Sequence, residues 1–136
     1  MIKIFSRDEM IDYVMSYGVS PDEYYISILP TGGPKGIPIF ENNLPNVITL
    51  VFDDVTKDCI KTQYPDGIGL RYAKAMTENQ ADLLVSFIRK VPNNATINIH
   101  CVQGHSRSMG IKRAILNEEP KGNKHVYSLI KERLHK

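Results

Sequence analysis

The sequence contains no long hydrophobic run. None of its apolar stretches approaches the roughly 20 residues that a helix needs to cross a bilayer, so we expect no membrane anchor. The first residues, MIKIFSRDEMIDYV, also lack the apolar segment of a signal peptide. Cysteine is scarce, and Cys59 and Cys101 are too few for a disulfide framework. These absences predict a protein of the reducing cytoplasm.

Neither sign of charge dominates the composition. The formal net charge of +2 is too small to indicate the dense basic face that binds a nucleic-acid backbone. Hydrophobic residues at 42% and charged residues at 24% are ordinary for a globular protein, and no repeat or low-complexity tract is visible. We therefore expect residues 1–136 to form one domain, in which any anion site is local.

Strand and helix patterns alternate along the chain. Strands are expected at 2–5, 24–29, 47–52 and 97–100, and helices after Ser6, after Thr77, from about Ser106 to Asn117, and around Val126 to Leu134. Irregular connections are expected at 30–46 and 56–76. This order favours an α/β fold with a mostly parallel, twisted central sheet flanked by helices. Ligand sites in such folds gather beyond the carboxyl ends of the strands.

One such strand end carries the segment INIHCVQGHSRSMG, residues 97–110. A thiol is a poor nucleophile until it ionises, and the backbone N–H groups of a curled loop before a helix lower the pKa of a cysteine such as Cys101. The same N–H groups can hold a phosphate. Gly104 gives the loop its backbone freedom, and Arg107 offers two parallel donors to two phosphate oxygens. The pattern predicts attack by sulfur on phosphorus.

Residues 100–108, HCVQGHSRS, resemble the signature of cysteine-dependent protein tyrosine phosphatases, and the dual-specificity-like branch most of all. FDDV at 52–55 resembles the F-x-D-[IV] segment of small bacterial and phage members of that branch. Their N-x-x-V-Y element is matched by Asn123, Val126 and Tyr127. The likeness spans roughly residues 47–130 and implies the phosphatase fold of that family.

The resemblance also implies roles for the signature residues. Cys101 is the implied nucleophile, and Arg107 is implied to grip the phosphate and stabilise the transition state. His100 is implied to help set the pKa of the thiol, and Ser108 to ease departure of the thiolate. The implied phosphate-binding loop consists of Val102, Gln103, Gly104, His105, Ser106 and Arg107.

Departure of the leaving oxygen calls for a general acid, which the family supplies as an aspartate on a separate loop. Asp54 matches the F-x-D-[IV] pattern directly after a predicted strand and is our preferred acid. Asp66, in QYPDGIG, resembles the Trp-Pro-Asp loop of classical tyrosine phosphatases and is the main alternative. The remaining alternatives are that Asp53 is the general acid or that the site has no general acid. Asp53 and Asp54 could also have a purely structural role, because paired aspartates commonly begin turns.

The predicted activity is hydrolysis of phosphotyrosine, and of phosphoserine or phosphothreonine, without a cofactor. The substrate would be a phosphorylated protein or another phosphomonoester. On the same site, RNA 5′-triphosphatase, nucleotide phosphatase and phosphoinositide phosphatase stay open, so a nucleic acid would enter only as a 5′-phosphorylated substrate. A phosphate-binding module without turnover and sulfur-transfer or arsenate chemistry are further alternatives. The spacing of His100, Cys101 and His105 matches no zinc pattern, and we expect no metal.

Overall fold

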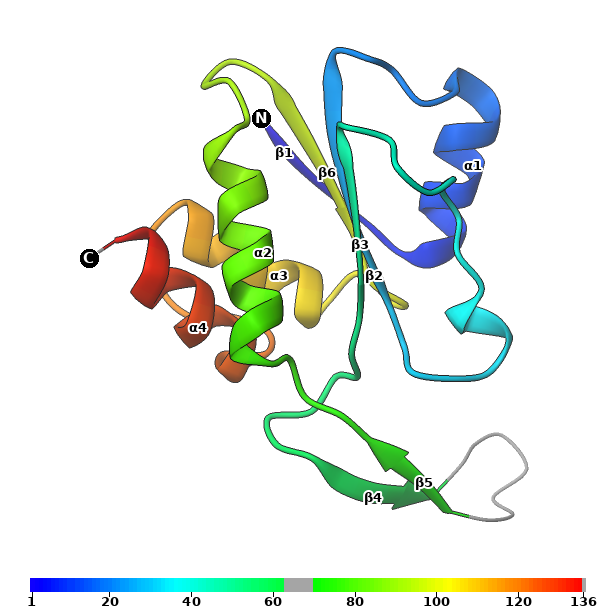
Figure 1. The fold of residues 1–136 in the computed structure, drawn as a ribbon, viewed down its shortest axis with the longest axis vertical. Helices are drawn as coiled ribbons and strands as arrows, with labels where there is room; N and C mark the ends of the chain where they lie inside the picture. Colours follow the sequence, from blue (N-terminus) through cyan, green and yellow to red (C-terminus); the bar gives the residue numbers. More distant parts are fainter. Residues whose placement is uncertain (63–69, 136) are drawn as a thin grey trace.

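A parallel four-stranded sheet forms the centre of the molecule, seen in a computed structural model that describes residues 1–62 and 70–135 (Figure 1). The strands are β1 (Ile2–Phe5), β2 (Glu23–Leu29), β3 (Val47–Val51) and β6 (Thr96–His100), in the order β1-β6-β2-β3. All three pairings are parallel, and Ile99 of β6 lies level with Ile4 and Ile26 on its two neighbours. The predicted strands and the α/β class are confirmed.

Helices cover both faces of this sheet. Figure 1 shows α1 (Arg7–Tyr17) on one face and α2 (Glu78–Arg89), α3 (Arg107–Ile115) and α4 (Lys124–Leu134) together on the other. The larger core lies under the three helices and includes Ile26, Ile28, Phe52, Leu84, Ile99, Ile111 and Ile130. Within the part of the chain that the structure describes, no helix is both long and apolar enough to traverse a bilayer.

The helices begin where the sequence predicts. Ser6 and Glu9 form a capping box at the start of α1, and Thr77 and Gln80 form another at the start of α2. Asn123 caps α4, because its side-chain oxygen accepts a hydrogen bond from Val126 N at 3.0 Å. These local bonds fix each helix start relative to the strand or loop before it.

A small antiparallel hairpin follows β3 and was not predicted from the sequence. It consists of β4 (Cys59–Thr62) and β5 (Leu70–Ala73), and it projects beyond the carboxyl ends of the central strands (Figure 1). Val55, Ala75 and Ala73 of β5 form a separate small core, with Cys59 of β4 packed against them. The connection after β2 contains a short 3-10 helix, η1 (Pro34–Gly36). Asp66 lies outside the described residues.

Candidate active site

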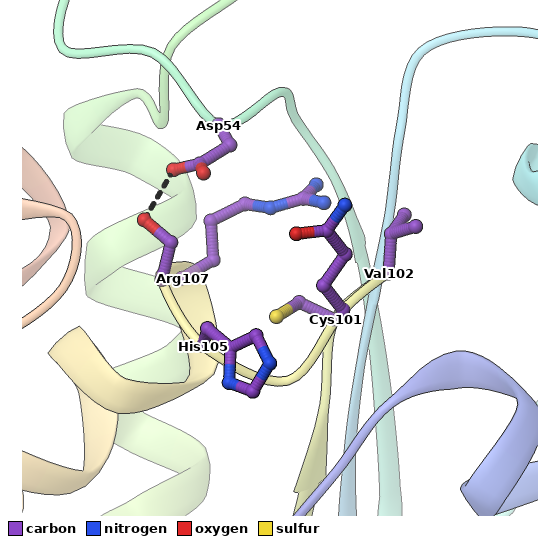
Figure 2. A pocket seen from close by; sticks show the side chains of 7 residues that line it. Asp54, Cys101, Val102, His105 and Arg107 are labelled. Atoms are coloured by element: carbon purple, nitrogen blue, oxygen red, sulfur yellow. Dashed lines mark hydrogen bonds between the residues drawn. The ribbon is translucent and has the colours of Figure 1, made fainter.

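The loop between β6 and α3 forms one wall of a pocket at the carboxyl end of the sheet. The pocket holds about 210 Å³ and is lined by Asp54, Cys101, Val102, Gln103, His105, Ser106 and Arg107. Figure 2 shows the side chains of Asp54, Cys101, His105 and Arg107 arranged around one common space. Residues predicted from two distant segments of the sequence therefore meet in one cavity.

Cys101 lies at the base of this pocket and is only 2% exposed. Its sulfur accepts a hydrogen bond from Gly104 N at 3.3 Å and lies 3.1 Å from the Ser108 hydroxyl. Burial raises the pKa of the thiol, but hydrogen bonds from Ser108 and Gly104 and the charge of Arg107 outweigh it. The net pKa of Cys101 lies below its ordinary value, which favours the nucleophilic thiolate.

Gly104 allows the loop to sit against the junction between β1 and α1. Its φ of +78° is one that other residues rarely adopt, and a Cβ there would lie 2.9 Å from backbone atoms of Phe5 and Ser6. Next to this contact, Arg7 N donates to the Val102 carbonyl at 3.0 Å. The glycine is thus required twice, for the curl of the loop and for the close backbone approach.

Arg107 is the first residue of α3 and is 5% exposed. Its Nη1 donates to the Phe52 carbonyl at 2.7 Å, which ties the guanidinium to the chain just beyond β3. This bond fixes the direction of a planar group whose parallel N–H donors match two oxygens of a phosphate. The N–H groups of the first turn of α3 add a partial positive charge at the same end of the pocket.

His100 contacts the backbone of Cys101. Its Nδ1 lies 3.2 Å from the Cys101 carbonyl, and its Nε2 lies 2.6 Å from the Ser27 hydroxyl. Burial lowers the pKa of His100 to about 4, so the ring is neutral at pH 7. Because a carbonyl only accepts, Nδ1 carries the hydrogen and Nε2 accepts from Ser27.

The two aspartates after β3 have different surroundings. Asp54 is exposed and lines the pocket, and its Oδ1 accepts from the Ser106 hydroxyl at 2.7 Å and from Asn123 Nδ2 at 2.9 Å. Asp53 is 3% exposed, is not among the residues that line the pocket, and accepts hydrogen bonds from Thr31 and from Lys74 N. Of these two candidates, only Asp54 lies in the pocket.

Comparisons with family models, curated proteins and solved structures found no match to this chain. Function is therefore inferred from the chemistry of the pocket. Among residues 1–62 and 70–135, no group of three His, Cys, Asp or Glu side chains is placed to hold a metal ion.

Sequence patterns assign no catalytic role to two residues of this site. Ser27 supports His100, and its signal is a single serine in the otherwise apolar and aromatic strand YYISIL, where it is fully buried. Asn123 contacts Asp54, although in the sequence it stands out only through the N-x-x-V-Y resemblance. Both contacts join residues at least 69 positions apart, so no local pattern encodes them.

Proposed function

We propose that this protein is a phosphatase that hydrolyses phosphomonoesters through a cysteinyl-phosphate intermediate, without a metal ion. One observation carries the proposal: the Cys101 sulfur has hydrogen-bond donors around it at the base of a pocket that Arg107 and Asp54 also line. A nucleophile, a phosphate-binding cation and a carboxyl group thus share one small cavity. Those are the groups that in-line displacement at phosphorus requires.

In the first step, the Cys101 thiolate attacks phosphorus while the bond from phosphorus to the ester oxygen breaks. Arg107 and the loop N–H groups hold the non-bridging oxygens and stabilise the charge of the transition state. Asp54, protonated at the start, donates its proton to the leaving oxygen, so an alcohol or phenol departs. The products are phosphocysteine and the Asp54 carboxylate.

In the second step, water attacks the phosphocysteine. The Asp54 carboxylate takes a proton from that water, and the bond between phosphorus and sulfur breaks. The Ser108 hydroxyl, 3.1 Å from the sulfur, stabilises the thiolate as it departs. Inorganic phosphate leaves, and both Cys101 and Asp54 return to their starting protonation states.

We propose phosphotyrosine as the main substrate and phosphoserine and phosphothreonine as further substrates. We also propose that the chain has the fold of the dual-specificity-like phosphatases. The parallel sheet with its loop at the end of β6 supports this assignment. A thiolate nucleophile remains active only while it is reduced, which suits the cytoplasm as its location. Other phosphomonoesters, including nucleotides and phosphoinositides, are the alternative substrates of the same site.

The proposal is tested with para-nitrophenyl phosphate in the presence of EDTA. Wild-type protein is expected to hydrolyse it, whereas Cys101→Ser abolishes turnover and Arg107→Ala reduces it by roughly a hundredfold or more. Cys59→Ser is the matched control, because Cys59 belongs to β4 of the hairpin and is not among the residues that line the pocket. Turnover that requires added metal, or that survives Cys101→Ser, contradicts the proposal. Retention of phosphate without turnover would instead indicate a binding module.

A further inference from the structure

The side chain of Asp54 is held through one of its two oxygens. Oδ1 accepts from the Ser106 hydroxyl at 2.7 Å and from Asn123 Nδ2 at 2.9 Å, and the first of these bonds is drawn in Figure 2. Among the residues that the structure describes, no hydrogen bond to Oδ2 is present. The two oxygens of this carboxyl group therefore have different surroundings.

Asn123 connects the acid to the phosphate-binding loop. Its backbone N donates to the Ser106 carbonyl at 3.0 Å, and its Nδ2 also lies 3.3 Å from the Val55 carbonyl. The preceding residue, Gly122, has φ of +78°, and a Cβ there would overlap the Ser106 carbonyl oxygen. Asn123 is 5% exposed. The turn before α4 therefore packs directly against the end of the phosphate-binding loop at Ser106, and Asn123 has little freedom to move.

This arrangement decides which oxygen of the acid carries the proton. A carboxylic acid has one O–H, and an oxygen that accepts two hydrogen bonds is the poorer place for it. In the proposed reaction, Oδ2 is therefore the oxygen expected to carry the transferred proton. A Ser106 hydroxyl alone could rotate, whereas the Asn123 amide is fixed by its own capping bond to Val126 N at 3.0 Å.

We propose that Asn123 is a positioning residue for the general acid: it holds Oδ1 of Asp54 so that Oδ2 delivers the proton to the leaving oxygen. This inference rests on the proposed phosphatase activity. It assigns to the start of α4, far along the chain from both Asp54 and Cys101, a part in the chemical step.

The test compares two leaving groups. para-Nitrophenol is acidic and departs with little help from an acid, whereas phenol depends on one. Asn123→Ser removes the Nδ2 donor and keeps a hydroxyl that can cap α4. It is expected to lower kcat for phenyl phosphate by about tenfold or more, and for para-nitrophenyl phosphate by no more than about threefold. An unchanged ratio of the two kcat values would overturn the inference.

Two further variants separate positioning from a loss of stability. Thr77→Ala removes the N-cap of α2, and Thr77 is not among the residues that line the pocket. This variant should destabilise the fold about as much as Asn123→Ser does, but it should leave the ratio of the two kcat values unchanged. Asn123→Asp keeps the cap oxygen and places a second carboxylate beside Asp54, so it should change the ratio in the same direction as Asn123→Ser. It serves as the test variant if Asn123→Ser does not fold.

A double-variant cycle shows whether Asn123 acts through Asp54. In the Asp54→Asn background, adding Asn123→Ser should leave the ratio unchanged, because the acid is already absent. A further tenfold change in that background would place the effect of Asn123 elsewhere and overturn the inference. Failure of the phosphatase proposal looks different, since then no Cys101-dependent hydrolysis exists in any variant.

Discussion

The hydroxyl of Ser108 lies 3.1 Å from the sulfur of Cys101, within the first turn of α3. Ser108 is fully buried, so this hydrogen bond is shielded from water. The bond is one of the interactions that lower the pKa of Cys101 against the opposing effect of burial. In the proposed reaction, this hydroxyl would also stabilise the negative charge that returns to the sulfur when phosphocysteine is hydrolysed.

Ser108→Ala is expected to change both steps of the reaction. Loss of the hydrogen bond raises the pKa of Cys101, so the acid limb of the profile of kcat/KM against pH moves to higher pH. Hydrolysis of phosphocysteine slows by roughly tenfold, since hydrogen bonds to charged groups contribute about 1.5–3 kcal/mol. Stopped-flow measurements should then show a burst of para-nitrophenol. Ser86→Ala, on the exposed face of α2, is the control. An unshifted acid limb would mean that Ser108 does not act on the thiolate.

Replacing each aspartate by asparagine in turn distinguishes the general acid from an aspartate that only stabilises the fold. Asp54→Asn is expected to lower kcat for phenyl phosphate by about a hundredfold with little change in Tm. Asp53→Asn should instead destabilise the fold by about 2 kcal/mol, because the buried carboxylate accepts from Thr31 and Lys74. Urea unfolding and steady-state kinetics measure the two effects. A hundredfold loss for Asp66→Asn, with Asp54→Asn fully active, would identify the other acid.

Gly104→Ala is expected to disrupt the loop. The added Cβ would meet backbone atoms of Phe5 and Ser6 at 2.9 Å, and alanine is strained at φ of +78°. We expect a loss of about 1–3 kcal/mol in the free energy of unfolding, together with weaker inhibition by vanadate. Gly32→Ala is the matched control, since a Cβ there meets nothing within 4 Å. Normal vanadate inhibition in Gly104→Ala would show that the loop tolerates the side chain.

Most of the fold follows from local sequence patterns. The apolar segments YYISIL and VITLV form neighbouring parallel strands, and both capping boxes start helices at the predicted residues. The β4-β5 hairpin could not be predicted in this way. Each of its strands has only four residues, and the small core of Val55, Ala73 and Ala75 is separate from the main one. Such tertiary packing leaves no periodic signal in the sequence.

Spacing alone predicts the candidate site only where its residues are close together in the chain, whereas the preference for Asp54 depended on the F-x-D-[IV] resemblance. The spacing of Cys101, Gly104 and Arg107 encodes the loop by itself. The choice between Asp53 and Asp54 depends on which one turns toward the pocket, and that is decided by bonds to residues far away, such as Thr31 and Asn123. His100 likewise needed the structure, because its partner Ser27 lies on another strand.

His100 should make the stability of the fold depend on pH. Its pKa is about 4 in the folded protein and near 6.5 in an unfolded chain, so the unfolded state binds more protons between these values. The free energy of unfolding should therefore decrease as the pH falls from 6.5 to 4, by at most about 3 kcal/mol. Urea unfolding at several pH values measures the slope. His100→Gln should flatten it.

Covalent trapping tests the central claim most directly. Protein turning over para-nitrophenyl phosphate is quenched rapidly in denaturant, and its peptides are analysed by mass spectrometry. We expect one phosphoryl group on the peptide that contains Cys101, more of it in Ser108→Ala, and none in Cys101→Ser. Turnover with Cys101 unmodified at every quench time, or a phosphoryl group on another residue, would contradict nucleophilic attack by this sulfur.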